Sequence, residues 1–130
     1  MGKLSGKIAI VTGGGSGFGA GIVAKFVADG AKVLVMDVNE GLAKEIIATL
    51  PPGSAVAIYG DVSSKDDWIA ALDAVLAAFG KLDIVVNNAG VLHKAQPSAE
   101  MDEEEYERIM RINVKQLFWS TTIIIPYFTV

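Results

Sequence analysis

Short runs of apolar residues alternate along the chain with longer segments in which apolar positions recur every three or four residues. The apolar runs cover residues 8–11, 33–36, 55–59 and 84–86. They are nearly unbroken and rich in β-branched side chains, which is typical of strands buried on both faces of a parallel sheet. The pattern therefore predicts four buried strands separated by helices.

The segments between these runs have the spacing of amphipathic helices. The clearest stripe comprises Trp68, Leu72, Val75, Leu76 and Phe79. Asp66 or Asp67 is available to cap the start of this helix, and Gly80 is available to end it. A last helix is expected to begin at Asp102 and to continue to Phe118, followed by an apolar tail over residues 123–128.

Strand and helix alternate four times, which predicts an α/β fold with a Rossmann-like, doubly wound parallel sheet of about four strands and flanking helices. Residues 1–130 contain no linker, low-complexity tract or block of like charge. We therefore expect one domain.

Composition narrows the classes of protein that fit this fold. The 130 residues include 11 Lys and Arg against 15 Asp and Glu, no cysteine, and 52% hydrophobic residues. Such a chain can bury a core and is not a disordered one. The lack of cysteine excludes disulfide scaffolds, thiolate zinc sites and cysteine nucleophiles, and we expect no metal site.

Charge and hydropathy also limit the expected partners. The net charge of −4 comes without a basic cluster, so nucleic acid is not an expected partner. No apolar run approaches the roughly 20 residues that span a bilayer, so no membrane partner is expected. The first seven residues lack the apolar core of a secretory signal, and we expect a cytoplasmic protein.

Glycines fill the turn between the first predicted strand and helix, Thr12-Gly13-Gly14-Gly15-Ser16-Gly17-Phe18-Gly19. Glycine permits a tight turn and a close approach of the backbone to an anion, and the start of the helix favours a phosphate. No Gly-Lys-Ser or Gly-Lys-Thr follows, which excludes a P-loop. A plain strand-to-helix loop is the alternative interpretation.

Acidic and amide residues follow the other strands. Asp37 ends the second strand, 18 residues after Gly19, where its carboxylate can accept hydrogen bonds from ribose hydroxyls and repel a 2′-phosphate. The glycine turn holds no lysine or arginine, so this position favours NAD over NADP. Asp61 and Val62 follow the third strand and could contact an adenine. The alternatives are a solvated strand end for Asp37 and a turn or cap role for Asp61.

After the fourth strand comes Asn87-Asn88-Ala89-Gly90. Asparagine can bond backbone groups across a crevice, and Ala-Gly leaves room for a flat ligand; the alternative is a simple turn. Together with Thr12-Gly13-x-x-x-Gly17-x-Gly19, Asp37, Asp61-Val62 and Asn113, this segment resembles the short-chain dehydrogenase/reductase family. The resemblance implies a Rossmann fold, a nicotinamide dinucleotide, and hydride transfer between an alcohol and a carbonyl.

The resemblance also implies a role for each matching residue. The pyrophosphate and its neighbouring ribose would be held by Gly13, Ser16, Gly17, Phe18 and Gly19. Asp37 would bind the adenosine ribose, Asp61 and Val62 would flank adenine, and Asn88, Ala89 and Gly90 would contact the cofactor. Asn87 would brace the sheet. Asn113 would be the catalytic asparagine, holding a water in a proton relay and locally disturbing its helix.

The family's catalytic Tyr-x-x-x-Lys and its preceding Ser are not found here. The residues four positions after Tyr59 and Tyr106 are Ser63 and Met110, and none follows Tyr127 at that distance. We therefore expect a truncated, cofactor-binding portion of an NAD-dependent oxidoreductase that is inactive alone, with an alcohol or ketone as the substrate in full-length relatives. The alternatives are a non-catalytic dinucleotide-binding or interaction module and an S-adenosylmethionine-dependent methyltransferase.

Three further expectations concern the surface. The fourth strand would be an open edge, and the apolar side of residues 106–118 with the tail 123–128 would promote self-association. His93, the single histidine, is interpreted as an exposed loop residue rather than a substrate contact. The acidic run over residues 100–105 is interpreted as a solvated helix start.

Overall fold

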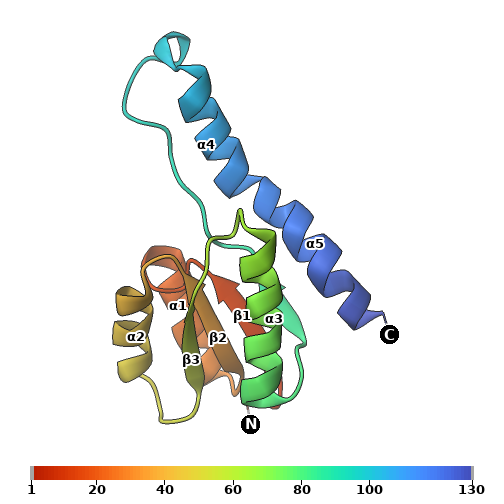
Figure 1. Ribbon diagram of the computed structural model, residues 1–130. Helices are drawn as coiled ribbons and strands as arrows, with labels where there is room; N and C mark the ends of the chain where they lie inside the picture. The colour runs from red at the N-terminus through yellow and green to blue at the C-terminus, as the bar shows by residue number, and fades with distance from the viewer. Residues whose placement is uncertain (1, 130) are drawn as a thin grey trace.

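Four parallel strands form one sheet in the order β3-β2-β1-β4 (Figure 1). The computed structural model describes residues 2–129. The strands are β1 Ile8–Thr12, β2 Lys32–Asp37, β3 Ala55–Tyr59 and β4 Ile84–Val86. The predicted parallel sheet is confirmed. After β3 the chain crosses to the other side of β1, and such a reversal opens a crevice at the carboxyl ends of the strands.

Helices cover both faces of the sheet (Figure 1). The long elements are α1 Gly17–Ala28, α2 Glu40–Ala48, α3 Lys65–Phe79, α4 Glu103–Asn113 and α5 Lys115–Phe128. A short 3-10 helix, Ser98–Glu100, precedes α4. Among residues 2–129, no helix has the length and apolar character needed to traverse a bilayer.

Alternate residues of the central strands pack into two separate hydrophobic cores, one on each face of the sheet. Ile10 packs on one face with Trp68 of α3 and Ile124 of α5. Val11 packs on the opposite face with Val23 of α1. All of these side chains are buried. Successive residues of a strand point to opposite faces of the sheet, and helices cover both faces. The interiors of the strands are thus apolar, as the runs in the sequence predicted, with polar residues at the ends of β1 and β2.

The N-terminal cap of α3 is Ser64, which corrects the prediction of Asp66 or Asp67. The Ser64 hydroxyl accepts a hydrogen bond from the backbone N–H of Asp67 at 3.2 Å. Asp66 and Asp67 instead occupy the first turn, where a negative charge is favourable. The predicted stop at Gly80 is confirmed, since this residue adopts the left-handed conformation with φ 82°.

The helix predicted from Asp102 to Phe118 is interrupted next to Asn113, where the resemblance implied a local disturbance, and its predicted end is wrong. Asp102 does cap α4, but the helix breaks at Val114, and α5 then continues through the predicted tail to Phe128. Pro126 removes one helical hydrogen bond. Tertiary contacts outweigh that loss, because Ile124 is only 2% exposed and the Tyr127 hydroxyl accepts a hydrogen bond from the Leu82 N–H.

Candidate functional site

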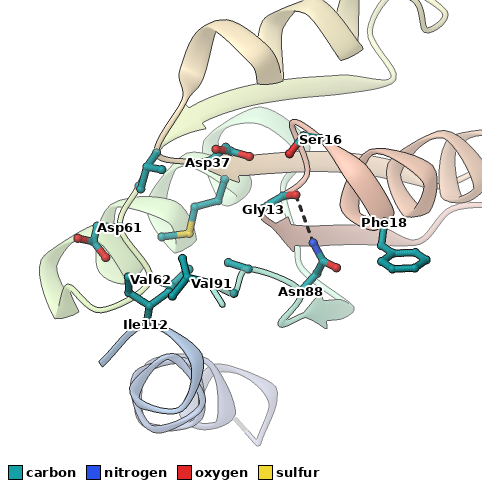
Figure 2. A pocket seen from close by; sticks show the side chains of 14 residues that line it. Gly13, Ser16, Phe18, Asp37, Asp61, Val62, Asn88, Val91 and Ile112 are labelled. Carbon is teal, nitrogen blue, oxygen red and sulfur yellow. Dashed lines mark hydrogen bonds between the residues drawn. The ribbon is translucent and has the colours of Figure 1, made fainter. Parts of the chain in front are cut away.

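A cleft of about 380 Å³ lies at the carboxyl edge of the sheet (Figure 2). Its lining comes from the end of β2, the segments after all four strands, the start of α1 and the end of α4. The lining residues are Gly13, Ser16, Phe18, Met36, Asp37, Val38, Gly60, Asp61, Val62, Asn88, Ala89, Gly90, Val91 and Ile112. Nine of the eleven residues that the sequence assigned to cofactor binding are therefore brought together in one cavity.

The other two, Gly17 and Gly19, do not line the cleft. A Cβ atom on Gly19 would lie 2.1 Å from the Gly13 carbonyl oxygen, so this position lets the start of α1 pack directly on the turn. Gly13 itself has a φ of 63°, and a Cβ there would lie 2.9 Å from the Cα of Ala89. The two glycines thus bring the β1–α1 turn against the segment that follows β4.

The start of α1 provides backbone donors beside the cleft that no bond within the helix uses. The first backbone bond into this helix runs from the Ala20 N–H to the Ser16 carbonyl, at 3.1 Å. The N–H groups of residues 17–19 consequently have no partner inside the helix. Ser16 adopts an extended conformation and makes no side-chain capping bond, and the Phe18 side chain is 90% exposed. Such a helix start favours an anionic ligand.

The carboxylate of Asp37 holds the glycine turn and the start of the β2–α2 loop together. Oδ2 accepts a hydrogen bond from the Gly15 N–H at 2.9 Å, and Oδ1 accepts one from the Asn39 N–H at 2.8 Å. Each oxygen keeps a second lone pair for a ligand hydroxyl. Asp37 and Asp61 are the charged side chains of the cleft lining, so the described cavity wall carries only negative charge.

Asp61 both lines the cleft and organises its own turn. Its Oδ1 accepts hydrogen bonds from the N–H and hydroxyl of Ser63 at 2.8 and 2.7 Å, while its own N–H donates to Asp67 at 2.8 Å. The carbonyl of Val62 accepts a hydrogen bond from the Trp68 indole at 2.9 Å. The turn role considered for Asp61 is thus present together with the cleft position.

The bracing role expected of Asn87 belongs to Asn88. The Asn88 amide nitrogen donates to the carbonyls of Thr12 and Gly13 at 3.0 and 3.2 Å, the second of which is drawn in Figure 2. Asn87 is exposed, and no side-chain hydrogen bond is described for it within residues 2–129. Successive side chains of an extended segment point to opposite sides. Because Asn88 faces β1, Asn87 points into solvent.

Two further polar residues, Thr12 and Gln116, were not assigned to the site from the sequence. The buried Thr12 hydroxyl accepts hydrogen bonds from the N–H groups of Asn88 and Ala89, each at 3.0 Å, and lies 3.3 Å from Oε1 of Gln116. Gln116 is 3% exposed, and its Nε2 donates to the Ala89 carbonyl. Its position, eight residues before the buried Ile124, could have indicated that it faces inward.

Asn113, the residue matched to the family's catalytic asparagine, lies beside the cleft rather than in its lining. Its Oδ1 accepts a hydrogen bond from the Val91 N–H at 2.7 Å, and its Nδ2 donates to the Val91 carbonyl at 2.8 Å. This pair fastens the segment after β4 to the end of α4. Its neighbours Val91 and Ile112 both line the cleft.

The acidic residues of the run over 100–105 are exposed as interpreted, except Glu105, which links α4 to the loop before it. Glu105 is 6% exposed, and its carboxylate accepts hydrogen bonds from Arg108 and from the Lys94 N–H. The hydrogen bond from Arg108 lowers the pKa of Glu105 to about 2. Arg108 also donates to the Leu92 carbonyl at 2.9 Å. His93, in the same loop, is exposed and outside the cleft lining, as expected.

Comparisons with known proteins identify the family of this chain. The short chain dehydrogenase family matches over residues 7–129. The chain is 42% identical over 128 residues to 4-formylbenzenesulfonate dehydrogenase of Comamonas testosteroni, covering 97% of this chain and 51% of that protein. It is 38% identical to 3beta-hydroxysteroid dehydrogenase 2 of Eggerthella lenta, covering 96% of this chain and 49% of that protein.

Solved structures give the same result. A 3-ketoacyl-(acyl-carrier-protein) reductase from Brucella melitensis, complexed with NADH, superposes with a TM-score of 0.92 at 40% identity and covers 97% of this chain and 52% of that one. The chain thus spans about half the length of the relatives it matches. It belongs to the short chain dehydrogenase family and has that family's Rossmann-like α/β fold.

Proposed function

We propose that the cleft binds a nicotinamide dinucleotide and that the chain is the cofactor-binding part of an NAD-dependent oxidoreductase. The observation that carries this proposal is the gathering of nine sequence-assigned residues around one cavity at the strand ends. Family membership supports it, since these enzymes bind nicotinamide dinucleotides, and the Brucella relative holds NADH. Such a cofactor supplies or accepts the hydride in the interconversion of an alcohol and a carbonyl.

The shape of the glycine turn fits a pyrophosphate. Gly19 has no side chain to separate α1 from the turn, and Gly13 has none to separate the turn from Ala89. The N–H groups of residues 17–19 lie beside the turn and have no partner inside the helix. We assign the pyrophosphate and its neighbouring ribose to Gly13, Ser16, Gly17, Phe18 and Gly19. Asp61 and Val62 would then flank adenine, and Asn88, Ala89 and Gly90 would form the facing wall.

We propose a preference for NAD over NADP. The free lone pairs of the Asp37 carboxylate suit the two ribose hydroxyls, and its charge repels a 2′-phosphate. No lysine, arginine or histidine is among the described residues that line the cleft, so none there offsets this repulsion.

We further propose that these 130 residues alone bind the dinucleotide without turning over an alcohol or ketone. The sequence contains no Tyr-x-x-x-Lys to supply the general acid, a group that typically contributes 10²- to 10⁴-fold to rate. Asn113 would position a water of the proton relay, with its side chain already held by Val91. The chain by itself is then a dinucleotide-binding module. Membership of the family excludes the methyltransferase alternative.

Isothermal titration with NADH, NADPH and S-adenosylmethionine tests these proposals together. We expect NADH to bind most tightly, and the Asp37→Ser variant to lose the preference over NADPH. Asp66→Asn removes one charge from an exposed position in α3 and should keep the preference. Binding of S-adenosylmethionine alone, or tighter binding of NADPH by the unmodified chain, would contradict the proposal. Turnover of a secondary alcohol by the purified chain would contradict inactivity.

A further inference from the structure

Gln116 is a buried polar side chain with partners on three separate elements. It lies in the first turn of α5 and is 3% exposed. Oε1 faces the Thr12 hydroxyl at the end of β1, and Nε2 faces the carbonyls of Ala89, after β4, and of Asn113, at the end of α4. No other described side chain joins these three segments.

The donors and acceptors around Gln116 fix the orientation of its amide. Two carbonyl oxygens face Nε2, so that end must be the amide NH₂. Oε1 is then left to accept from the Thr12 hydroxyl at 3.3 Å. Thr12 already accepts from the N–H groups of Asn88 and Ala89, so its one proton must point away from them, toward Gln116 or the Val86 carbonyl at 3.4 Å.

Ala89 is consequently held through both of its backbone polar groups. Its N–H donates to Thr12, and its carbonyl accepts from Gln116. Ala89 lines the cleft, and its Cα is the atom against which Gly13 packs. A shift of this residue would therefore move the cleft wall and the glycine turn together.

We propose that Gln116 is a positioning residue of the dinucleotide site: its amide holds Ala89 and Thr12 in place and couples them to the α4–α5 junction that carries Asn113. The proposal rests on the proposed function for its effect on cofactor affinity. Its structural part, the placement of Ala89, can be measured without a ligand.

Gln116→Leu and Ser120→Ala make a matched pair for the test. Leucine keeps volume at 116 but removes both ends of the amide. Ser120 is also buried, one turn later in α5, but its hydroxyl bonds only to the Leu117 carbonyl of its own helix. Amide hydrogen exchange read by NMR reports on residues 88 and 89, NADH titration reports on the site, and urea unfolding reports on global stability.

In Gln116→Leu we expect NADH affinity to fall and exchange at residues 88 and 89 to quicken, each by about tenfold, as for loss of a buried hydrogen bond with its partners left unpaired. Ser120→Ala should change neither, even where it lowers stability to the same extent. Equal effects in both variants would reduce Gln116 to a purely structural residue and overturn the proposal. Unchanged exchange in Gln116→Leu would overturn it as well.

Gln116→Glu gives an independent readout that mere destabilisation would not produce. A carboxylate at this position would face two carbonyl oxygens, which raises its pKa, whereas the protonated acid can again donate to one of them. The partners of Gln116 are uncharged. Lys65 at the start of α3 and Lys115, next to Gln116 in the sequence, lie over the Trp119 ring.

NADH affinity of Gln116→Glu should therefore recover as the pH is lowered from about 8 to about 6, relative to the unmodified chain at each pH. A pH-independent deficit would contradict the assigned direction of the bonds. If the unmodified chain bound no NADH, the proposed function would fail, and exchange at residues 88 and 89 would still decide the role of Gln116 in placing the wall.

Discussion

At the scale of single residues, Gly19 and Gly21 lie two positions apart in α1 but have opposite surroundings. A Cβ on Gly19 would lie 2.1 Å from the Gly13 carbonyl oxygen and 2.5 Å from the Asn88 amide nitrogen, whereas one on Gly21 meets nothing within 4 Å. We expect Gly19→Ala to lower the free energy of unfolding by ~1–3 kcal/mol through overpacking and to weaken NADH binding.

Gly21→Ala is the control, and it should raise the free energy of unfolding by ~0.5–1 kcal/mol because alanine is the better helix former. Urea denaturation measures both values. Equal stability changes in the two variants would show that the contact of Gly19 with the turn does not constrain the site.

We expect the free energy of unfolding to depend on pH through Glu105. The hydrogen bond from Arg108 lowers its pKa to about 2, against a usual value of 4.5. The folded state therefore binds this proton less readily than the unfolded state does. The resulting stabilisation is fully present above pH 4.5 and is lost as the pH falls toward 2.

Glu105→Gln should lower stability at neutral pH and show a smaller loss between pH 4.5 and 2 than the unmodified chain. Glu104→Gln, an exposed neighbour in the same turn, is the control. Urea unfolding at a series of pH values checks this, and parallel pH profiles for all three chains would contradict it.

Residue types near strand ends could be predicted, but their hydrogen bonds could not. The glycine turn, Asp37 and Asp61 stand next to apolar runs, so their gathering follows from the parallel sheet alone. The partners of Asn88 and Gln116 lie 76 and 104 residues away in the sequence, at Thr12. The packing of β1, β4 and α5 determines which atoms these side chains bond.

At the scale of elements, the cap of α3 can be tested against the one that the sequence suggested. Ser64→Ala removes the hydroxyl that accepts from the Asp67 N–H, and we expect a loss of about 1 kcal/mol in the free energy of unfolding. Asp66→Ala removes only a favourable charge in the first turn, so the loss should be a few tenths of a kcal/mol. Urea unfolding compares them, and the reverse order would contradict the assignment of the cap.

The strands could be predicted because the signal for each one lies in its own residues. The strand runs are apolar because both faces are covered, so the sequence located all four within one residue at each end. The break at Val114 and the continuation of α5 past Pro126 depend on contacts of Asn113 with Val91 and of Ile124 with the core. Such long-range contacts override the local signals that proline and helical spacing provide.

At the scale of the whole molecule, α4 and α5 follow one another as a long, bent rod, with α4 standing clear of the sheet (Figure 1). The rod carries seven large apolar side chains that are 37–52% exposed. They are Tyr106, Met110, Val114, Leu117, Phe118, Ile125 and Phe128. Most are three or four residues apart, which places them along one side of the rod. β4 is an edge strand of the described sheet, because it pairs only with β1.

A continuous apolar stripe of this kind is a site of association between proteins, and we expect the purified chain to self-associate through it. Sedimentation velocity should show a weight-average mass that rises with protein concentration. Leu117→Glu places a charge in the middle of the stripe and should shift the chain toward the monomer, because burying an unpaired carboxylate in the contact is unfavourable. Leu92→Glu introduces the same charge at a side chain that is 87% exposed in the loop before α4, away from the stripe, and should leave association unchanged. A concentration-independent monomer would contradict the expectation, and equal effects of the two substitutions would place the contact elsewhere.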